Sequence, residues 1–151
     1  MRLELTHRGD YAIRAMIALG HANGLAGRLS VRRIAEQMTI PVAFLPRVMR
    51  DLVAAGLVEA MAGRTGGYRL ARPAEAIPVL EIIESIEGDS RRTTCVLRGV
   101  PCGLDGHCDV HDVFFAAQAS LLDRLRRATL ADLLAKPEVP VEEPVLVASP
   151  S

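Results

Sequence analysis

The sequence predicts a mainly α-helical protein with one small β-hairpin and a long helix near the C-terminus. Three observations support this prediction. Apolar residues recur at helical spacing through most of the chain, a glycine-rich segment separates two short strand-like runs, and the longest helical pattern covers residues 110–128. The chain has 151 residues, of which 50% are hydrophobic, so it is long enough to bury a core.

Three helices are expected in the N-terminal part of the chain. The first covers Thr6–His21, and the second covers Val31–Met38 behind Ser30, whose hydroxyl is suited to cap its N-terminus. The third ends at about Ala55. Pro46 falls inside it and either begins the helix or kinks it. The apolar side of the third helix is formed by Phe44, Leu45, Val48, Met49 and Leu52.

A β-hairpin and a fourth helix follow. Two strand-like runs, 57–60 and 68–71, flank a tip at 63–67 whose three glycines can take positive φ angles. The fourth helix is expected over 77–86. Its spacing predicts buried positions at Leu80, Ile83 and Ile86.

The longest helix is expected over residues 110–128. Its apolar residues advance by three or four positions, and Phe115 and Leu122 widen the apolar surface beyond one stripe. A small domain would struggle to cover this surface alone, so we interpret the helix as a dimer seam. A short last helix follows, with a capping-box pattern at Thr129 and Asp132. The seam consists of Val110, Phe114, Ala117, Leu121, Leu125 and Ala128.

Charge is distributed unevenly along the chain, although 18 basic and 18 acidic residues cancel overall. Residues 1–72 carry eleven arginines and five acids, a net charge of +6. Residues 73–151 carry seven basic and thirteen acidic groups, a net charge of −6. A basic half is typical of a module that binds a polyanion, joined to a module with another task.

Arginines lie on the helix-turn-helix and hairpin segments that are expected to touch DNA. A recognition helix fits the major groove, where its exposed residues read base edges while their neighbours hold phosphates. We therefore expect binding to double-stranded DNA; the alternative is a solvated basic face on a small helical domain. The candidate DNA-binding residues on the second helix, the third helix and the hairpin are Arg32, Arg33, Arg47, Arg50, Arg64 and Arg69.

Three cysteines, Cys95, Cys102 and Cys108, lie within one glycine-containing segment at spacings of x6 and x5. Such a backbone can wrap around a metal or cluster. Buried apolar cysteines are the alternative, but Arg98 and His107 beside them are not typical of a core. Zinc sites usually contain closely paired cysteines, and none are present. Three widely spaced thiolates with one other ligand favour an iron–sulfur cluster.

Several segments form a combined signature: Met-Arg-Leu at 1–3, Gly-Asp-Tyr-Ala-Ile-Arg-Ala-Met at 9–16, Ile-Ala-Glu at 34–36, Gly-Arg-Thr-Gly-Gly-Tyr-Arg-Leu-Ala at 63–71, and the three cysteines. With these residues the chain resembles the IscR/NsrR/RirA family of bacterial iron–sulfur transcription regulators, the Rrf-two family. The resemblance implies a winged helix-turn-helix homodimer joined through the long helix. It also implies a 2Fe–2S or 4Fe–4S cluster that controls promoter binding in response to nitric oxide, iron supply or redox state.

The resemblance offers two candidates for the fourth cluster ligand. His111 matches the histidine that IscR-like members use for a 2Fe–2S cluster. Asp10 matches the carboxylate with which NsrR-like members reach across the dimer to a 4Fe–4S cluster. We favour His111, because its place three residues after Cys108 makes no demand on the dimer interface. Alternatively, Asp10 simply favours the first turn of a helix, and His111 caps or lines the start of the long helix.

These patterns divide the chain into four parts. Residues 1–87 form a winged helix-turn-helix DNA-binding region, and residues 88–109 form the cysteine loop that binds the cluster. Residues 110–135 contain the dimerisation helix and the short C-terminal helix. Residues 136–151 are rich in Pro, Val and Glu without periodicity and are expected to form a disordered tail.

Other classes of protein fit the sequence less well. No stretch is long and apolar enough for a membrane span and the N-terminus lacks a signal peptide's apolar centre, so we expect a cytoplasmic protein. We expect no enzyme; a thiol redox enzyme using Cys95 or Cys102 with His107 or His111 is less favoured, since no Cys-x-x-Cys pair exists. A zinc-stabilised or cluster-free winged-helix regulator is the runner-up, and an adaptor that binds a protein through the acidic half is a third hypothesis.

Overall fold

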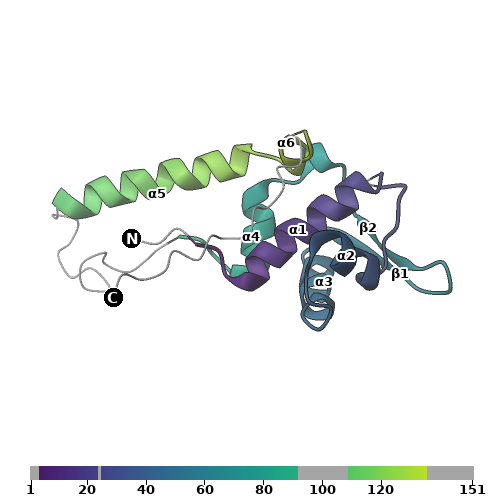
Figure 1. Cartoon of the computed structure of the whole chain (residues 1–151). Coiled ribbons are helices and arrows are strands. Elements are labelled where there is room, and N and C mark those ends of the chain that lie inside the picture. Colours follow the sequence, from purple (N-terminus) through teal and green to yellow (C-terminus); the bar gives the residue numbers. More distant parts are fainter. Residues whose placement is uncertain (1–3, 24, 92–108, 136–151) are drawn as a thin grey trace, which may run out of the picture.

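The computed structural model describes residues 4–23, 25–91 and 109–135, and these residues form helices around one β-hairpin (Figure 1). The predicted mainly α-helical fold with a small hairpin is confirmed. The cysteine segment from 92 to 108 and the tail from 136 lie outside the described residues. The elements are α1 (His7–His21), α2 (Val31–Met38), α3 (Leu45–Ala54), β1 (Val58–Met61), β2 (Gly67–Leu70), a 3₁₀ turn (Ala74–Ala76), α4 (Val79–Glu87), α5 (Asp109–Arg127) and α6 (Leu130–Leu134).

Side-chain caps fix the starts of α1 and α2 where the sequence predicts them. The Thr6 hydroxyl accepts a hydrogen bond from the Gly9 amide, and the Ser30 hydroxyl accepts one from the Arg33 amide. Each cap satisfies an N–H group that the helix itself leaves unpaired. The short helix α6 begins with the predicted capping box between Thr129 and Asp132.

The start of α3 agrees, to within one residue, with the alternative in which Pro46 begins the helix. The helix begins at Leu45, and Pro46 lies in its first turn, where a missing amide costs nothing. Phe44 therefore lies on the preceding turn and is 54% exposed, so its predicted place on the buried side is wrong. Its ring contacts Tyr11 instead, with ring centroids 5.9 Å apart.

The hairpin is antiparallel, and each strand lies within one residue of its predicted position. Its register places Val58 opposite Leu70 and Glu59 opposite Arg69. Leu29, which precedes α2, exchanges two backbone hydrogen bonds with Tyr68, at 3.0 and 2.8 Å. Gly67 has φ of 146°, and a Cβ there would lie 2.8 Å from the Leu29 carbonyl oxygen. The hairpin is thus fastened to the segment that leads into α2.

The core surrounds α1, which contacts α2, α3, α4 and α6. Leu80 and Ile83 of α4 are buried as predicted, whereas Ile86 is only partly buried. Among the described residues, no charged or polar residue is fully buried. The largest fully buried side chains are Met16, Leu19, Ile34, Leu45, Met49, Leu52, Leu57, Leu70, Ile77, Ile82 and Leu130.

The last residue of α4 holds the N-terminus of α1. The Glu87 carboxylate accepts hydrogen bonds from the Thr6 amide at 2.7 Å and from the Thr6 hydroxyl at 2.8 Å. A carboxylate at a helix N-terminus also interacts favourably with the helix dipole. Gly88 follows Glu87, so this contact lies at the point where the chain continues from α4 towards the cysteine segment.

The long helix α5 extends away from the rest of the described fold (Figure 1). Its C-terminal end is fastened to the start of α4 by two backbone hydrogen bonds, Val79 N to Ala128 O and Leu130 N to Ile77 O, both 2.8 Å. None of the described helices combines the length and hydropathy that a membrane span needs.

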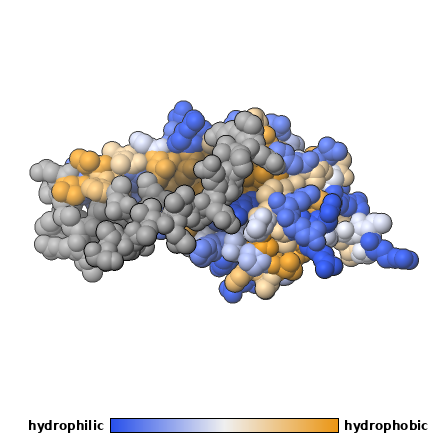
Figure 2. All heavy atoms as spheres, in the orientation of Figure 1, coloured by the Kyte–Doolittle hydropathy of each residue, from blue (hydrophilic) through white to orange (hydrophobic). Residues whose placement is uncertain are grey.

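The apolar surface of α5 is largely exposed, as Figure 2 shows in orange towards the free end of the helix. Leu122 is an exception: it is 8% exposed and faces α4, so it is covered within its own chain rather than widening the predicted seam. The exposed large apolar residues of this helix are Val110, Val113, Phe114, Phe115 and Leu121.

Candidate nucleic-acid interface

Helices α2 and α3 and the hairpin lie together at the end of the molecule opposite the free end of α5 (Figure 1). On α2, the side chains of Arg32 and Arg33 are 85% and 66% exposed. Both guanidinium groups lie 3.6 Å from the carboxylate of the same residue, Glu36. Such exposed, long pairs are weak, so both arginines can exchange Glu36 for another anion.

The outer side of α3 is basic. Its inner side is formed by Leu45, Val48, Met49 and Leu52, which are all buried. Arg47 and Arg50 lie on the opposite side and are exposed, as predicted. Arg50 lies 3.8 Å from Asp51, whereas Arg47 forms no ion pair with any residue that the structure describes.

A contact that the sequence did not reveal links α1 to α3. The Arg8 guanidinium donates a hydrogen bond to the Asp51 carboxylate, and the two side chains are 39% and 25% exposed. Asp51 is the single acidic residue of α3, and Arg8 of α1 forms an ion pair with it. Since the residues are 43 positions apart, only the packing of α1 against α3 could have indicated the pair.

The hairpin presents one free arginine and one paired arginine. Arg64 at the tip is exposed and forms no ion pair within the described part of the chain. Arg69 lies opposite Glu59 across the strands and pairs with it at 2.7 Å, with 33% of its side chain exposed. Arg28, which sequence reasoning missed, donates to the Thr65 carbonyl at 3.5 Å. Arg64 is therefore the hairpin arginine best placed to meet a phosphate.

Of the candidate cluster ligands, the structure describes Asp10 and His111. Asp10 in the first turn of α1 pairs with Arg14 at 2.7 Å, so it would have to release Arg14 to bind a metal. His111 in the first turn of α5 stacks on Phe115, with centroids 5.7 Å apart. Its nitrogens make no hydrogen bond to a described residue. Cys95, Cys102 and Cys108 lie outside the described residues, and the rest contain no cluster of three potential metal ligands.

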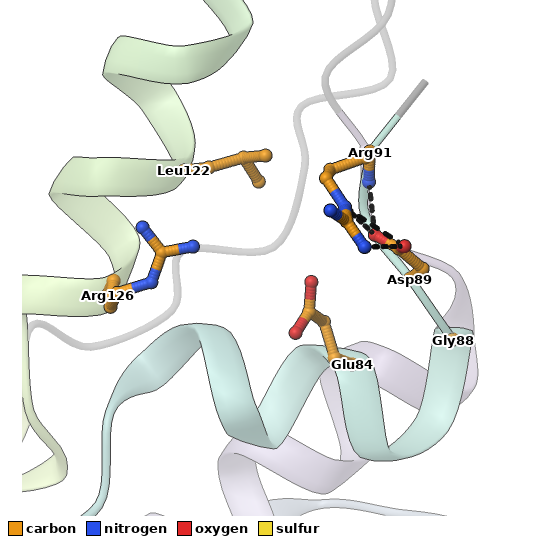
Figure 3. Close-up of a pocket in the computed structure, with 6 residues that line it drawn as sticks. All are labelled: Glu84, Gly88, Asp89, Arg91, Leu122 and Arg126. Carbon is orange, nitrogen blue, oxygen red and sulfur yellow. Dashed lines mark hydrogen bonds and ion pairs between the residues drawn. The ribbon is translucent and has the colours of Figure 1, made fainter. Parts of the chain in front are cut away.

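A pocket of about 530 Å³ opens between the end of α4 and α5 (Figure 3). Glu84 points into it from α4, between Arg126 of α5 and the Asp89–Arg91 ion pair. Hydrogen bonds from Arg91 lower the pKa of Asp89 to about 2. Leu122 lines the pocket from α5. The other lining side chains are mostly charged, and they surround the point where the chain continues from α4 towards the cysteine segment.

A family model described as an iron-dependent transcriptional regulator, Rrf2, matches residues 5–136. The chain belongs to the Rrf2 family. The predicted resemblance is confirmed, and the relatives in this family are transcriptional regulators. Rrf2 membership implies DNA binding, in agreement with the exposed arginines on α2, α3 and the hairpin tip.

Curated relatives match over most of the chain. Protein aau3 of Rhizobium meliloti is 32% identical over 150 residues, which cover 95% of this chain and 96% of the relative. The regulator NsrR of Shouchella clausii is 31% identical over 135 residues, covering 87% and 89% of the two chains. The regulator IscR of Cereibacter sphaeroides is 40% identical over 86 residues, 56% of each chain.

Solved structures of Rrf2 regulators show the same fold. CymR, the global cysteine regulator of B. subtilis, has a TM-score of 0.76 at 25% identity, covering 91% of this chain and all of CymR. IscR of T. potens has a TM-score of 0.67 at 29% identity, covering 87% and 86%. The predicted winged helix-turn-helix is thus confirmed: α2 and α3 are its two helices, and β1–β2 is its wing.

Proposed function

We propose that this protein is a homodimeric transcription regulator that acts in the cytoplasm, binds a pseudo-palindromic operator and is controlled by an iron–sulfur cluster. The observation that supports operator binding most directly is the pair of exposed arginines Arg47 on α3 and Arg64 on the wing, which form no ion pair with any residue that the structure describes. A recognition helix reads base edges in the major groove, and a wing contacts the neighbouring backbone or minor groove. The remaining candidate contacts are Arg32, Arg33, Arg50 and Arg69.

The exposed apolar side of α5 supports the homodimer. Contiguous apolar surface of this kind marks an interaction site in a folded protein, and a second copy offers an identical apolar helix. Two copies joined through α5 would present two recognition helices. We expect half-sites one helical turn apart, roughly 34 Å.

The donor set supports the cluster. Cys95, Cys102 and Cys108 with His111 would hold it. The imidazole of His111, which makes no hydrogen bond to a described residue, suits this role better than Asp10, which pairs with Arg14. When bound, the cluster would supply reactivity towards nitric oxide, oxidants or iron shortage. The cysteine segment connects α4 to α5, so we expect cluster binding to this segment to change the angle of α5.

Substitution of Arg47 and Arg64 tests operator binding. Arg64→Ala is expected to weaken binding to all sequences and to reduce the salt slope by about one, as loss of one phosphate contact does. Arg47→Ala is expected to change which operators are preferred. Competition between randomised duplexes and titrations at several salt concentrations measure both effects. If neither substitution changes affinity, salt slope or preference, operator binding through α3 and the wing is contradicted.

The Arg8–Asp51 pair gives a second prediction. Arg8→Ala is expected to weaken DNA binding about fivefold, because an exposed ion pair contributes up to about 1 kcal/mol and the freed Asp51 would repel phosphates and attract Arg50. Asp51→Asn in the same chain should restore binding. Arg72→Ala breaks a similarly exposed pair with Glu81 of α4 and serves as the matched control. Weak binding that persists in the double variant would contradict this role of Arg8.

Anaerobic purification tests the cluster. We expect visible absorption together with iron and acid-labile sulfide, and loss of all three when the three cysteines are replaced by alanine. His111→Ala should alter the electron paramagnetic resonance and Mössbauer spectra, whereas Asp10→Ala should leave them unchanged. The reverse result would make Asp10 the ligand. Zinc without sulfide would favour the zinc-stabilised, non-sensing regulator instead.

A further inference from the structure

The turn between α2 and α3 exposes an apolar patch on an otherwise basic surface. Val42 and Phe44 are 52% and 54% exposed, and Ala43 between them is exposed as well. Figure 2 shows apolar surface surrounded by hydrophilic surface in the helix-turn-helix region. Single exposed apolar residues are ordinary, but two large ones beside the N-terminus of a recognition helix need an explanation.

The Phe44 ring is held in place rather than free in solvent. The Phe44 amide donates to the Pro41 carbonyl at 3.1 Å, and the Leu45 amide donates to the Val42 carbonyl at 3.3 Å. One side of the ring contacts Tyr11, which in turn stacks on His7 at a centroid distance of 6.2 Å. The exposed part of the ring is thus presented in a defined direction.

The surroundings of the patch indicate its occupant. Arg47 lies three residues after Phe44 and therefore neighbours it on the helix surface. Arg50 lies one further turn along, and both arginines are exposed. An apolar protein surface would leave these cations without partners, whereas duplex DNA offers phosphates and guanines to them. The one apolar group in the major groove is the thymine 5-methyl, which phenyl and aliphatic side chains contact.

We infer that Phe44, with Val42 beside it, contacts one thymine methyl group in each half-site and determines a preference for thymine at that position. This inference rests on the proposed function and assigns the base-reading role of the turn before α3. Cytosine lacks the methyl and presents a polar amino group, so a C·G pair leaves the ring without an apolar partner.

Deoxyuridine provides the direct test, because it differs from thymidine in the methyl alone. Operators are first selected from a randomised duplex library with the full chain, and each thymine is then replaced singly by deoxyuridine. We expect one position per half-site where the replacement weakens binding about fourfold, the effect of one methylene-sized group. Replacement in both half-sites is expected to weaken binding about fifteenfold.

Variants of Phe44 test whether this residue makes the methyl contact. Phe44→Ala should weaken binding to the thymine operator and abolish the difference between thymine and deoxyuridine, whereas Phe44→Leu should retain much of it. Arg47→Ala is the matched control, since it should lower affinity while keeping the methyl dependence. Thermal unfolding of each variant shows whether the fold is intact.

The outcomes separate this inference from the proposed function. A protein that selects no duplex at any salt concentration would overturn both. Operator binding with equal affinity for thymine and deoxyuridine at every position would overturn the inference and leave DNA binding intact. A methyl dependence that persists in Phe44→Ala would assign the contact to another residue and also overturn it.

Discussion

Replacement of Phe114 and Phe115 by glutamate is expected to convert the proposed homodimer to a monomer and to weaken operator binding by at least about a hundredfold. Phe114 is 38% exposed and Phe115 is 60% exposed on the apolar side of α5. Carboxylates there would become buried without partners in a dimer seam, which costs several kcal/mol. A monomer holds one half-site and loses the effective concentration that a linked second module supplies.

Light scattering after size exclusion and operator titration measure these two effects. The matched control is Ala116→Glu with Ser120→Glu, which adds the same charges to exposed positions of α5 that point away from Phe114 and Phe115. This control should remain dimeric and bind with unchanged affinity. A dimer that survives the phenylalanine substitutions would place the dimer interface elsewhere.

The second prediction with a large expected effect concerns the stability contributed by the buried side of α3. Leu52→Ala is expected to reduce the free energy of unfolding by about 2–5 kcal/mol, because Leu52 is fully buried and truncation leaves a cavity. Such a loss is a large share of the total stability of a small domain. Arg50→Ala on the exposed side of α3 should change it by less than about 0.5 kcal/mol.

Chemical denaturation followed by circular dichroism compares the two α3 variants. We expect a lower midpoint with an unchanged denaturant slope for Leu52→Ala. Arg50→Ala should instead act on DNA affinity while the midpoint stays the same. Equal midpoints for the two variants would show that the helix tolerates the cavity.

Local patterns sufficed to predict most of the fold. Ser30 and the Thr129–Asp132 pair predicted helix starts correctly because capping depends on residues three positions apart. Phe44 misled the prediction for α3, since its spacing fits the apolar side while the helix begins one residue later. Leu122 was counted as widening the apolar surface beyond the seam, because the sequence cannot say which side of α5 meets α4.

The candidate site was less accessible to sequence reasoning. Exposed arginines on α2, α3 and the hairpin tip could be predicted, and their role in DNA contact stays a prediction. The Glu59–Arg69 pair depends on the hairpin register, and the Arg8–Asp51 pair depends on how α1 meets α3. Both are long-range consequences of packing. The role of Cys95, Cys102 and Cys108 as cluster ligands likewise stays a prediction, because these residues lie outside the described ones.

Because α5 is joined to the start of α4 at its C-terminal end, a small change in its angle moves its N-terminal end a long way. Its 19 residues extend about 28 Å from the backbone hydrogen bonds that join Val79 to Ala128 and Ile77 to Leu130. A tilt of about 10° at this joint would move the free tip by about 5 Å, more than a base-pair step of DNA. Because main-chain atoms form the joint, side-chain substitutions there leave its hydrogen bonds intact. Under the proposed function, cluster binding to the cysteine segment would change the angle from the free end of the helix.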